Sequence, residues 1–217
     1  MDRREMLKIA AAMGLVGPVA VSTAGAEMLL ELLPPQADSG MPLLRALKNR
    51  QSTREFSTKK LPPQVLSNLL WAAYGISRPS TGGRTAPSAH GWQEVEVYVV
   101  MENGLFRYDY KAHALQLVKP VDLRRQTGLQ DFTGIAPLDL VYVADFGRME
   151  GAGMDDKVMY SAADTGFIAQ NVYLCCAAEG LATVVRGLLD RRVLGEAMGL
   201  DAQQRIVLAQ TVGYPAA

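Results

Sequence analysis

The sequence predicts a single domain of the α+β class. Segments with strand character and segments with helix character are mixed along the chain, without the strict β-α-β alternation of a doubly wound parallel sheet. The chain has 217 residues, which suffices for one sizeable core but not comfortably for two. No internal repeat, low-complexity tract or linker divides it. We therefore expect one fold built around one sheet.

The helices and turns of the first half are marked by leucine, proline and glycine. Leucines between residues 43 and 47 share one face of a short helix. Pro62 and its neighbouring proline begin a second helix, which ends at Gly75. Residues 77–91 show no periodicity, and a loop of this length in a compact domain is usually functional or disordered.

Four strands are expected next. Valines at alternate positions between residues 95 and 99 predict a half-buried strand. Asn103-Gly104 suits a tight turn into a second strand, and a third short strand covers residues 114–118. Residues 138–144 are nearly all apolar, which is typical of a central strand covered on both faces.

The longest predicted helix spans residues 161–179 and ends at Gly180. It is apolar almost all round, so we expect it to be buried on every side, and its small residues permit close approach by another helix. A short strand at residues 182–185, a helix that begins after Asp190 and a buried strand at residues 206–212 complete the chain.

Charge and hydropathy limit the partners of this domain. Lysines plus arginines and aspartates plus glutamates number 22 each, so the formal net charge is zero. A chain without net charge has no overall field that favours nucleic acid or an anionic membrane. After residue 26, no segment approaches the roughly 20 apolar residues of a membrane span. We therefore expect no nucleic-acid partner and no stable membrane insertion.

The first 26 residues resemble a twin-arginine export signal. Asp2–Lys8 contains two adjacent arginines, the apolar run Ile9–Val21 is too short to span a bilayer, and Ala24–Ala26 offers small residues for cleavage before Glu27. This interpretation divides the chain into a signal (residues 1–26) and a domain (residues 27–217) and places the domain in the periplasm. If the signal is not used, the protein stays in the cytoplasm. The alternative is an N-terminal helix that lies on the domain.

Residues for several kinds of catalysis are missing. The sequence contains no G-x-S-x-G, no H-E-x-x-H, no phosphate-binding loop and no G-x-G-x-x-G between a strand and a helix. His90 and His113 are the only histidines, and the adjacent pair Cys175 and Cys176 fits neither a C-x-x-C motif nor a zinc site. We therefore expect no metal and no hydrolase or kinase activity.

An arginine-rich segment follows the first helix. In Arg50–Phe56 (R-Q-S-T-R-E-F), Arg50, Ser52 and Arg54 alternate, so an extended backbone projects all three to the same side. Two guanidinium groups and a hydroxyl suit an anion such as phosphate, because arginine supplies forked donors. Taken alone, the pattern is more typical of a solvated edge.

A second motif stands in the long loop. Arg84–Ala89 (R-T-A-P-S-A) is followed by Gln93 and a strand of the E-V-Y-V-V type, and later by Gln170-Asn171 and the closing Val212–Pro215. In this order and spacing, from about Leu43 to Pro215, the chain resembles the nitroreductase family of FMN-dependent oxidoreductases. The layout is most similar to the branch of the thiazole- and oxazole-forming dehydrogenases.

The resemblance implies a nitroreductase-like fold, with a central, mostly antiparallel sheet flanked by helices, in a homodimer that binds FMN. Arg50 and Ser52 would hold the phosphate and ribityl chain, and Arg54 would approach the pyrimidine edge. The loop motif would line the flavin from the partner subunit, and Val184–Gly187 would pass over its face. The implied cofactor-binding residues are Arg50, Gln51, Ser52, Arg54, Pro87, Ser88, Ala89, Gln93, Val184, Val185, Arg186 and Gly187.

Three positions depart from the family pattern. Gly91 stands where relatives often have asparagine, and Arg186 stands where many have glutamate before the flavin-facing glycine. Basic residues near the C-terminus, which often contact the phosphate, are missing. Arg84 is one candidate to replace that charge.

The family activity is ping-pong hydride transfer through flavin N5 from a small-molecule donor to a nitroaromatic, quinone or similar acceptor. Since the flavin carries this chemistry, no catalytic side chain is expected. Three alternatives stay open: an azole-forming type of dehydrogenase that oxidises its substrate, a non-catalytic FMN-binding protein, and a structural dimer with an empty site.

Overall fold

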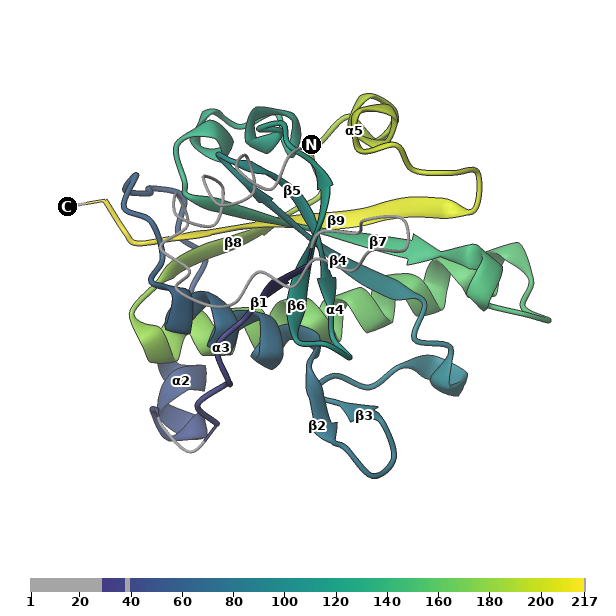
Figure 1. Ribbon diagram of the computed structural model, residues 1–217, viewed down its shortest axis with the longest axis horizontal. Helices are drawn as coiled ribbons and strands as arrows, with labels where there is room; N and C mark the ends of the chain where they lie inside the picture. Colours follow the sequence, from purple (N-terminus) through teal and green to yellow (C-terminus); the bar gives the residue numbers. More distant parts are fainter. Residues whose placement is uncertain (1–28, 38–39, 217) are drawn as a thin grey trace.

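The computed structural model describes residues 29–37 and 40–216 (Figure 1), so the predicted export signal lies outside the described residues. Its centre is a seven-stranded sheet with the strand order β1-β6-β5-β4-β7-β9-β8, and every neighbouring pair is antiparallel. This confirms the predicted α+β class and its antiparallel sheet. The strands are β1 (Leu29–Glu31), β4 (Val95–Met101), β5 (Gly104–Asp109), β6 (Ala114–Lys119), β7 (Leu138–Asp145), β8 (Ala182–Arg186) and β9 (Gln204–Gly213).

Helices cover both faces of this sheet (Figure 1). One face packs against α3 and α4, and their buried side chains form one large apolar cluster with β4, β5 and β7. The other face packs against α5 and the segment around Leu123. The helices are α2 (Leu43–Asn49), α3 (Pro63–Tyr74), α4 (Met154–Glu179) and α5 (Arg191–Met198), and short 3-10 turns are η1 (Ala89–Gly91), η2 (Arg124–Gln126), η3 (Asp131–Gly134) and η4 (Phe146–Arg148).

β4 is more buried than the sequence predicted, because both faces of the sheet are covered. The alternating valines predicted a half-buried strand, but Tyr98 and Val100, on the second face, are also buried. The prediction was wrong because α5, contributed from nearly a hundred residues later, supplies Leu194 and Met198 to that face. β7, predicted to be covered on both faces, is confirmed as a buried strand between β4 and β9.

Most of the local signals for element ends are confirmed, but α4 begins at Met154, seven residues before the predicted start at Ser161. Pro63 is the first residue of α3, and Gly75 caps its C-terminus. Gly180 ends α4 in the left-handed conformation with a φ of 69°, which favours glycine. The Asp190 side chain accepts a hydrogen bond from the Val193 amide and so caps α5.

The loop predicted at residues 77–91 is ordered and contains short elements. A two-stranded hairpin, β2 (Ile76–Arg78) with β3 (Gly83–Arg84), precedes η1. Strands of three and two residues are too short to show periodicity. The same holds for β1, a three-residue edge strand that pairs with β6.

One face of α4 is open in the single chain. Met159 and Phe167, which are eight positions apart and therefore lie on the same side of the helix, are 51% and 48% exposed, respectively. The prediction of burial on every side was therefore wrong for one protomer, because α3 and the sheet cover only the opposite face. The leucines of α2 are exposed as well. In the described part of the chain, no helix is both long and apolar enough to cross a membrane.

Candidate functional site

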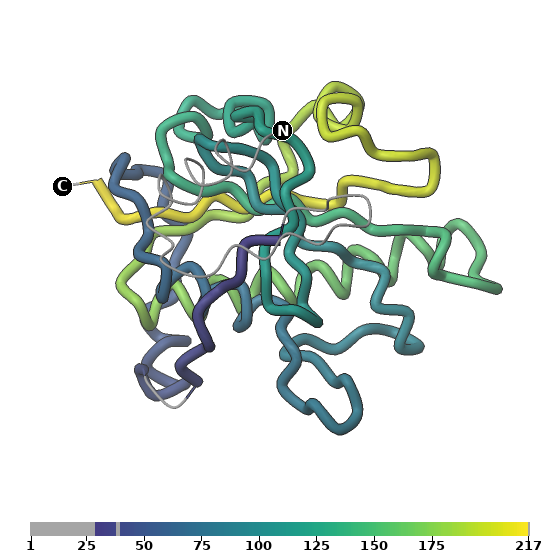
Figure 2. Tube along the Cα trace, viewed as in Figure 1, coloured from purple at the N-terminus to yellow at the C-terminus, as the bar shows by residue number. Residues whose placement is uncertain are grey.

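The arginine segment runs from the end of α2 along the outer strand β8. Thr53 donates its amide hydrogen to the Thr183 carbonyl over 3.0 Å. Since side chains alternate along an extended segment, Arg50, Ser52 and Arg54 lie on the other side from Thr53. Ser52 and Arg54 are exposed and Arg50 is half-buried. Figure 2 shows this segment beside the C-terminal end of the chain, where Phe56 forms a β-bridge with Pro215.

Tyr173 of α4 completes this part of the site. Its hydroxyl lies 2.8 Å from Ser52 Oγ and accepts a hydrogen bond of 3.0 Å from the Val185 amide. The Arg50 guanidinium carbon lies 5.2 Å from the centre of the Tyr173 ring. The sequence analysis missed Tyr173, and the only signal for it was a phenol inside an otherwise apolar helix, which normally finds a hydrogen-bond partner when buried.

Arg186 turns its side chain into the protein. Nη2 donates to Asp139 Oδ1 over 2.8 Å, and Nη1 donates to the Thr127 carbonyl over 2.7 Å. The Arg186 guanidinium therefore lies in the interior, where it is hydrogen-bonded to Asp139 and Thr127. Of the other predicted residues here, Val184 is buried in an apolar cluster with Phe56, Val185 is half-buried, and Gly187, directly after the strand, is exposed.

Asp139 and Arg186 form a buried ion pair. Burial raises the pKa of Asp139 to about 7, although Arg186 and the hydroxyl of Thr211 act in the opposite direction. Burial also lowers the pKa of Arg186. Asp139 Oδ2 and Arg186 Nε have no hydrogen-bond partner among the described residues. Removal of either charge would leave the other one without compensation in the interior.

The A-P-S-A loop is docked on α4. The Ala89 amide donates to Asp164 Oδ2 over 2.9 Å, and Ser88 Oγ accepts from the Gln93 amide over 2.8 Å. Ser88 also donates to Glu94, which is fully buried and whose pKa is raised by burial and by the nearby Asp164. Pro87 is exposed, and Ser88 and Ala89 are half-buried.

Arg84 and Gln93 contact each other and other side chains of the same protomer. The Arg84 guanidinium carbon lies 4.0 Å from the centre of the Tyr74 ring and 3.4 Å from that of Tyr110. Its Nη2 donates to Gln93 Oε1 over 2.8 Å, and Arg84 is only 4% exposed. Arg84 does not lie free beside Arg50, so the structure gives no support to the idea that it supplies the missing phosphate charge.

The two halves of the predicted site are not together in one protomer. The loop contacts α4 at Asp164 and the arginine segment contacts it at Tyr173. These positions are separated by about 14 Å along the helix axis at 1.5 Å per residue. In Figure 1 the arginine segment lies beyond α2 at the left, whereas β3 and the loop that follows it lie farther right. A single protomer therefore does not bring the A-P-S-A loop next to the arginine segment.

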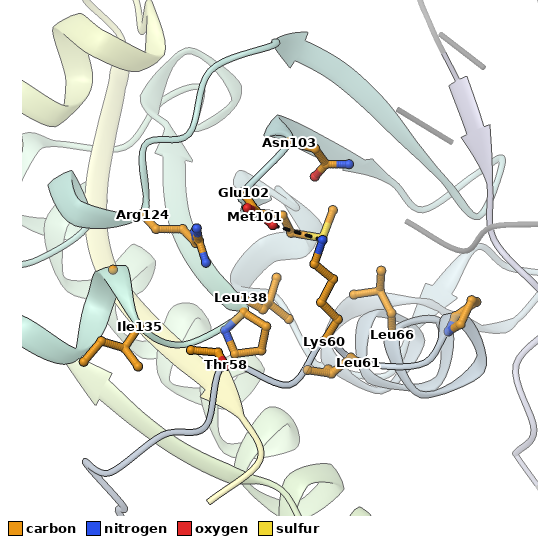
Figure 3. A pocket seen from close by; sticks show the side chains of 13 residues that line it. Thr58, Lys60, Leu61, Leu66, Met101, Glu102, Asn103, Arg124, Ile135 and Leu138 are labelled. Atoms are coloured by element: carbon orange, nitrogen blue, oxygen red, sulfur yellow. Dashed lines mark ion pairs between the residues drawn. The ribbon is translucent and has the colours of Figure 1, made fainter. Parts of the chain in front are cut away.

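A separate cavity of about 200 Å³ lies between the segment before α3, the β4–β5 turn and η2–η3 (Figure 3). Apolar side chains such as Leu66 and Leu138 line it, and an exposed ion pair of 2.9 Å between Lys60 and Glu102 crosses its mouth. No predicted site residue, all of which the structure describes, lines this cavity. It is therefore distinct from the candidate cofactor site. Among the described residues, no group of three His, Cys, Asp or Glu side chains could hold a metal ion.

The chain was compared with known protein families, proteins and structures. Residues 47–214 match the model of the nitroreductase family. The chain belongs to this family. A protein of Methanocaldococcus jannaschii that carries the name of a nitroreductase is 32% identical over 151 residues, which cover 65% of this chain and 76% of the relative.

Two crystal structures have folds similar to that of this chain. A protein from Ralstonia eutropha JMP134, also described as a nitroreductase, is 48% identical and superposes with a TM-score of 0.84 over 94% of this chain and 96% of the other. The NADPH:FMN oxidoreductase from Vibrio harveyi, solved with NAD+, has a TM-score of 0.61 at 19% identity over 81% of this chain and 69% of the other. The latter likeness concerns the fold alone.

Proposed function

We propose that this protein is an FMN-dependent oxidoreductase that acts as a homodimer. The observation that carries the proposal is the convergence of Arg50, Ser52 and the end of β8 around Tyr173. The cation and the hydroxyl suit a phosphate, and the exposed Gly187 gives a flat ring system access to the strand. FMN carries both chemical groups, so the residues present fit it.

Each residue then has a task that its chemistry supports. Arg50 neutralises the phosphate with charge-assisted hydrogen bonds, and Ser52 adds a neutral donor. Arg54, which is exposed, supplies positive charge at the pyrimidine edge and so favours the anionic reduced form. FMN held by these residues would supply the chemistry, which is hydride transfer through N5 between two substrates. The protein contributes position and electrostatics, without an acid or base of its own.

The proposed acceptor is a small electron-poor molecule such as a nitroaromatic or a quinone. Alternatives are a dehydrogenase of the azole-forming type and an FMN-binding protein without turnover. The twin-arginine pattern further leads us to propose export to the periplasm, where nicotinamide nucleotides are scarce. A membrane quinol or another redox protein would then be the donor.

The proposed function is tested by an absorption spectrum of the protein before and after denaturation. Flavin bands, with FMN rather than FAD released, would support the cofactor assignment. Steady turnover with any donor and acceptor would then separate an enzyme from a storage protein. A colourless protein that also fails to bind added FMN would contradict the proposal.

Phe167→Glu is expected to dissociate the homodimer and to release FMN. Phe167 lies on the exposed apolar face of α4, and a carboxylate there would be buried without a partner against a second copy. Because the loop and the arginine segment are separated within one protomer, a monomer would hold only half of the site. Size-exclusion chromatography with detection of flavin absorbance measures both effects.

The matched control for this experiment is Val121→Glu. Val121 is also an exposed apolar residue, but it follows β6 and lies outside α4. Its substitution should leave both the dimer and the flavin in place. A Phe167→Glu monomer that keeps its FMN at low protein concentration would refute the shared site.

A further inference from the structure

Tyr173 joins two segments of the proposed cofactor site that are far apart in the sequence. Its hydroxyl contacts Ser52 Oγ at 2.8 Å and the Val185 amide nitrogen at 3.0 Å. Ser52 belongs to the arginine segment, whereas Val185 belongs to β8. Tyr173 is only 7% exposed, whereas Ser52 is exposed. The side chain thus holds the arginine segment in a fixed position on β8.

These contacts define the direction of the hydrogen bond between the two hydroxyls. An amide N–H can only donate, so the Tyr173 oxygen accepts from Val185. The phenolic hydrogen then requires an acceptor, because a buried donor without a partner is costly. Ser52 Oγ is the acceptor that lies within reach. Ser52 therefore accepts from Tyr173, and its own hydrogen is left to donate to another group.

The free hydrogen of Ser52 lies beside a positive charge. Ser52 is exposed on the side away from the buried phenol, so its donor is accessible to a ligand. The Arg50 guanidinium lies over the same Tyr173 ring, 5.2 Å from its centre. One side chain therefore places a hydroxyl donor and a guanidinium next to each other. This combination suits an oxyanion, because both groups offer hydrogen-bond donors and the guanidinium also offers a positive charge.

We propose that Tyr173 is a positioning residue that makes Ser52 a dedicated hydrogen-bond donor to the phosphate group of FMN. This inference rests on the proposed function and extends it to a residue outside the arginine and A-P-S-A motifs. It gives Tyr173 a part in specificity, since riboflavin has the same ring system and ribityl chain as FMN but no phosphate. Tyr173 itself needs no contact with the cofactor.

The test compares FMN with riboflavin as ligands of the full-chain protein after dialysis to remove flavin. Quenching of flavin fluorescence gives the dissociation constants. We expect Ser52→Ala to weaken FMN binding about tenfold, as for loss of one hydrogen bond to a charged group. Tyr173→Phe should weaken it several-fold, and the double variant should bind no more weakly than Ser52→Ala, because both changes remove the same donor. Riboflavin affinity should stay within about twofold of the unaltered protein in all three.

Tyr108→Phe is the matched control. Tyr108 is a buried tyrosine whose hydroxyl lies 2.8 Å from His113 Nδ1, so the same atom is removed from β5, which β4, β7 and β9 separate from β8 in the sheet. This variant should bind both flavins normally. If Tyr173→Phe fails to fold because the Val185 amide loses its partner, Ser52→Ala still tests the donor, since it leaves the contact between Tyr173 and Val185 intact.

Three results would overturn the inference. Equal weakening of FMN and riboflavin by Tyr173→Phe would mean that the residue only supports the fold of the site. Unchanged FMN affinity in Ser52→Ala would show that Ser52 does not serve the phosphate. Absence of FMN binding by the unaltered protein would refute the proposed function, and this inference with it. This result is seen without any variant, which distinguishes it from the first two results.

Discussion

Arg50→Ala is expected to weaken FMN binding by about 10- to 150-fold, which corresponds to the loss of about 1.5–3 kcal/mol of charge-assisted hydrogen bonding. Arg50 lies at the start of the arginine segment, half-buried beside the Tyr173 ring. Its guanidinium offers several donors to one phosphate. Titration of the flavin-free protein with FMN measures the effect.

Arg45→Ala is the appropriate control for this experiment. Arg45 is an exposed arginine in α2, five positions before Arg50, so its removal changes the net charge equally. It should leave FMN affinity within about twofold, because exposed charges contribute little at a distance. Unchanged FMN affinity in Arg50→Ala would contradict the assignment of the whole arginine segment to the phosphate.

Arg186→Met is expected to lower the free energy of unfolding by about 3–5 kcal/mol, the usual cost of removing one partner from a buried ion pair. The side chains of Arg186 and Asp139 are 3% and 0% exposed. The substitution strands the Asp139 carboxylate and removes hydrogen bonds to Thr127. Urea unfolding followed by circular dichroism measures the change. A loss below about 1 kcal/mol would show that this pair contributes little.

The loss of stability in Arg186→Met should increase as pH rises. Burial already raises the pKa of Asp139 to about 7 while Arg186 opposes the increase, so removal of Arg186 raises this pKa further. Above pH 7, the folded variant keeps a proton that the folded unaltered protein has released. The stability of the variant then falls more steeply as pH rises, and the difference in unfolding free energy between the two proteins widens.

The double variant Arg186→Met/Asp139→Leu separates loss of the pair from loss of packing. With both charges replaced by apolar groups, no charge is stranded, and much of the lost stability should return. The widening of the stability difference with pH should also disappear, because the titrating carboxyl is gone. A double variant as unstable as Arg186→Met would locate the effect in the hydrogen bonds to Thr127 instead.

Element ends could be predicted because each depends on one or two neighbouring residues. Pro63, Gly180 and Asp190 act through backbone geometry and capping within a single turn. The hairpins at β2–β3 and the edge strand β1 were missed, since two or three residues carry no periodicity. The second buried face of β4 was missed because its cover, α5, comes from a distant part of the chain.

The candidate site, like the fold, could be predicted from the sequence only in part. The alternation of Arg50, Ser52 and Arg54 and the spacing of the A-P-S-A loop were sufficient to identify the family, and the family match over residues 47–214 agrees. The individual tasks of these residues stay predictions. The inward path of Arg186, toward Asp139, could not be predicted because Asp139 lies in β7, on the far side of β9 from β8.

By itself, the sequence determined the α+β class, the starts of α3 and α5, the C-terminal end of α4 and the residues that mark the family, because these follow from local periodicity, capping and motif order. Only the tertiary structure decided which faces are buried, that Tyr173 joins Ser52 to Val185, and that the loop and the arginine segment are separated within one protomer. The physical reason is that burial and hydrogen bonding between distant segments depend on how the helices and strands pack, and no local pattern in the chain encodes that packing.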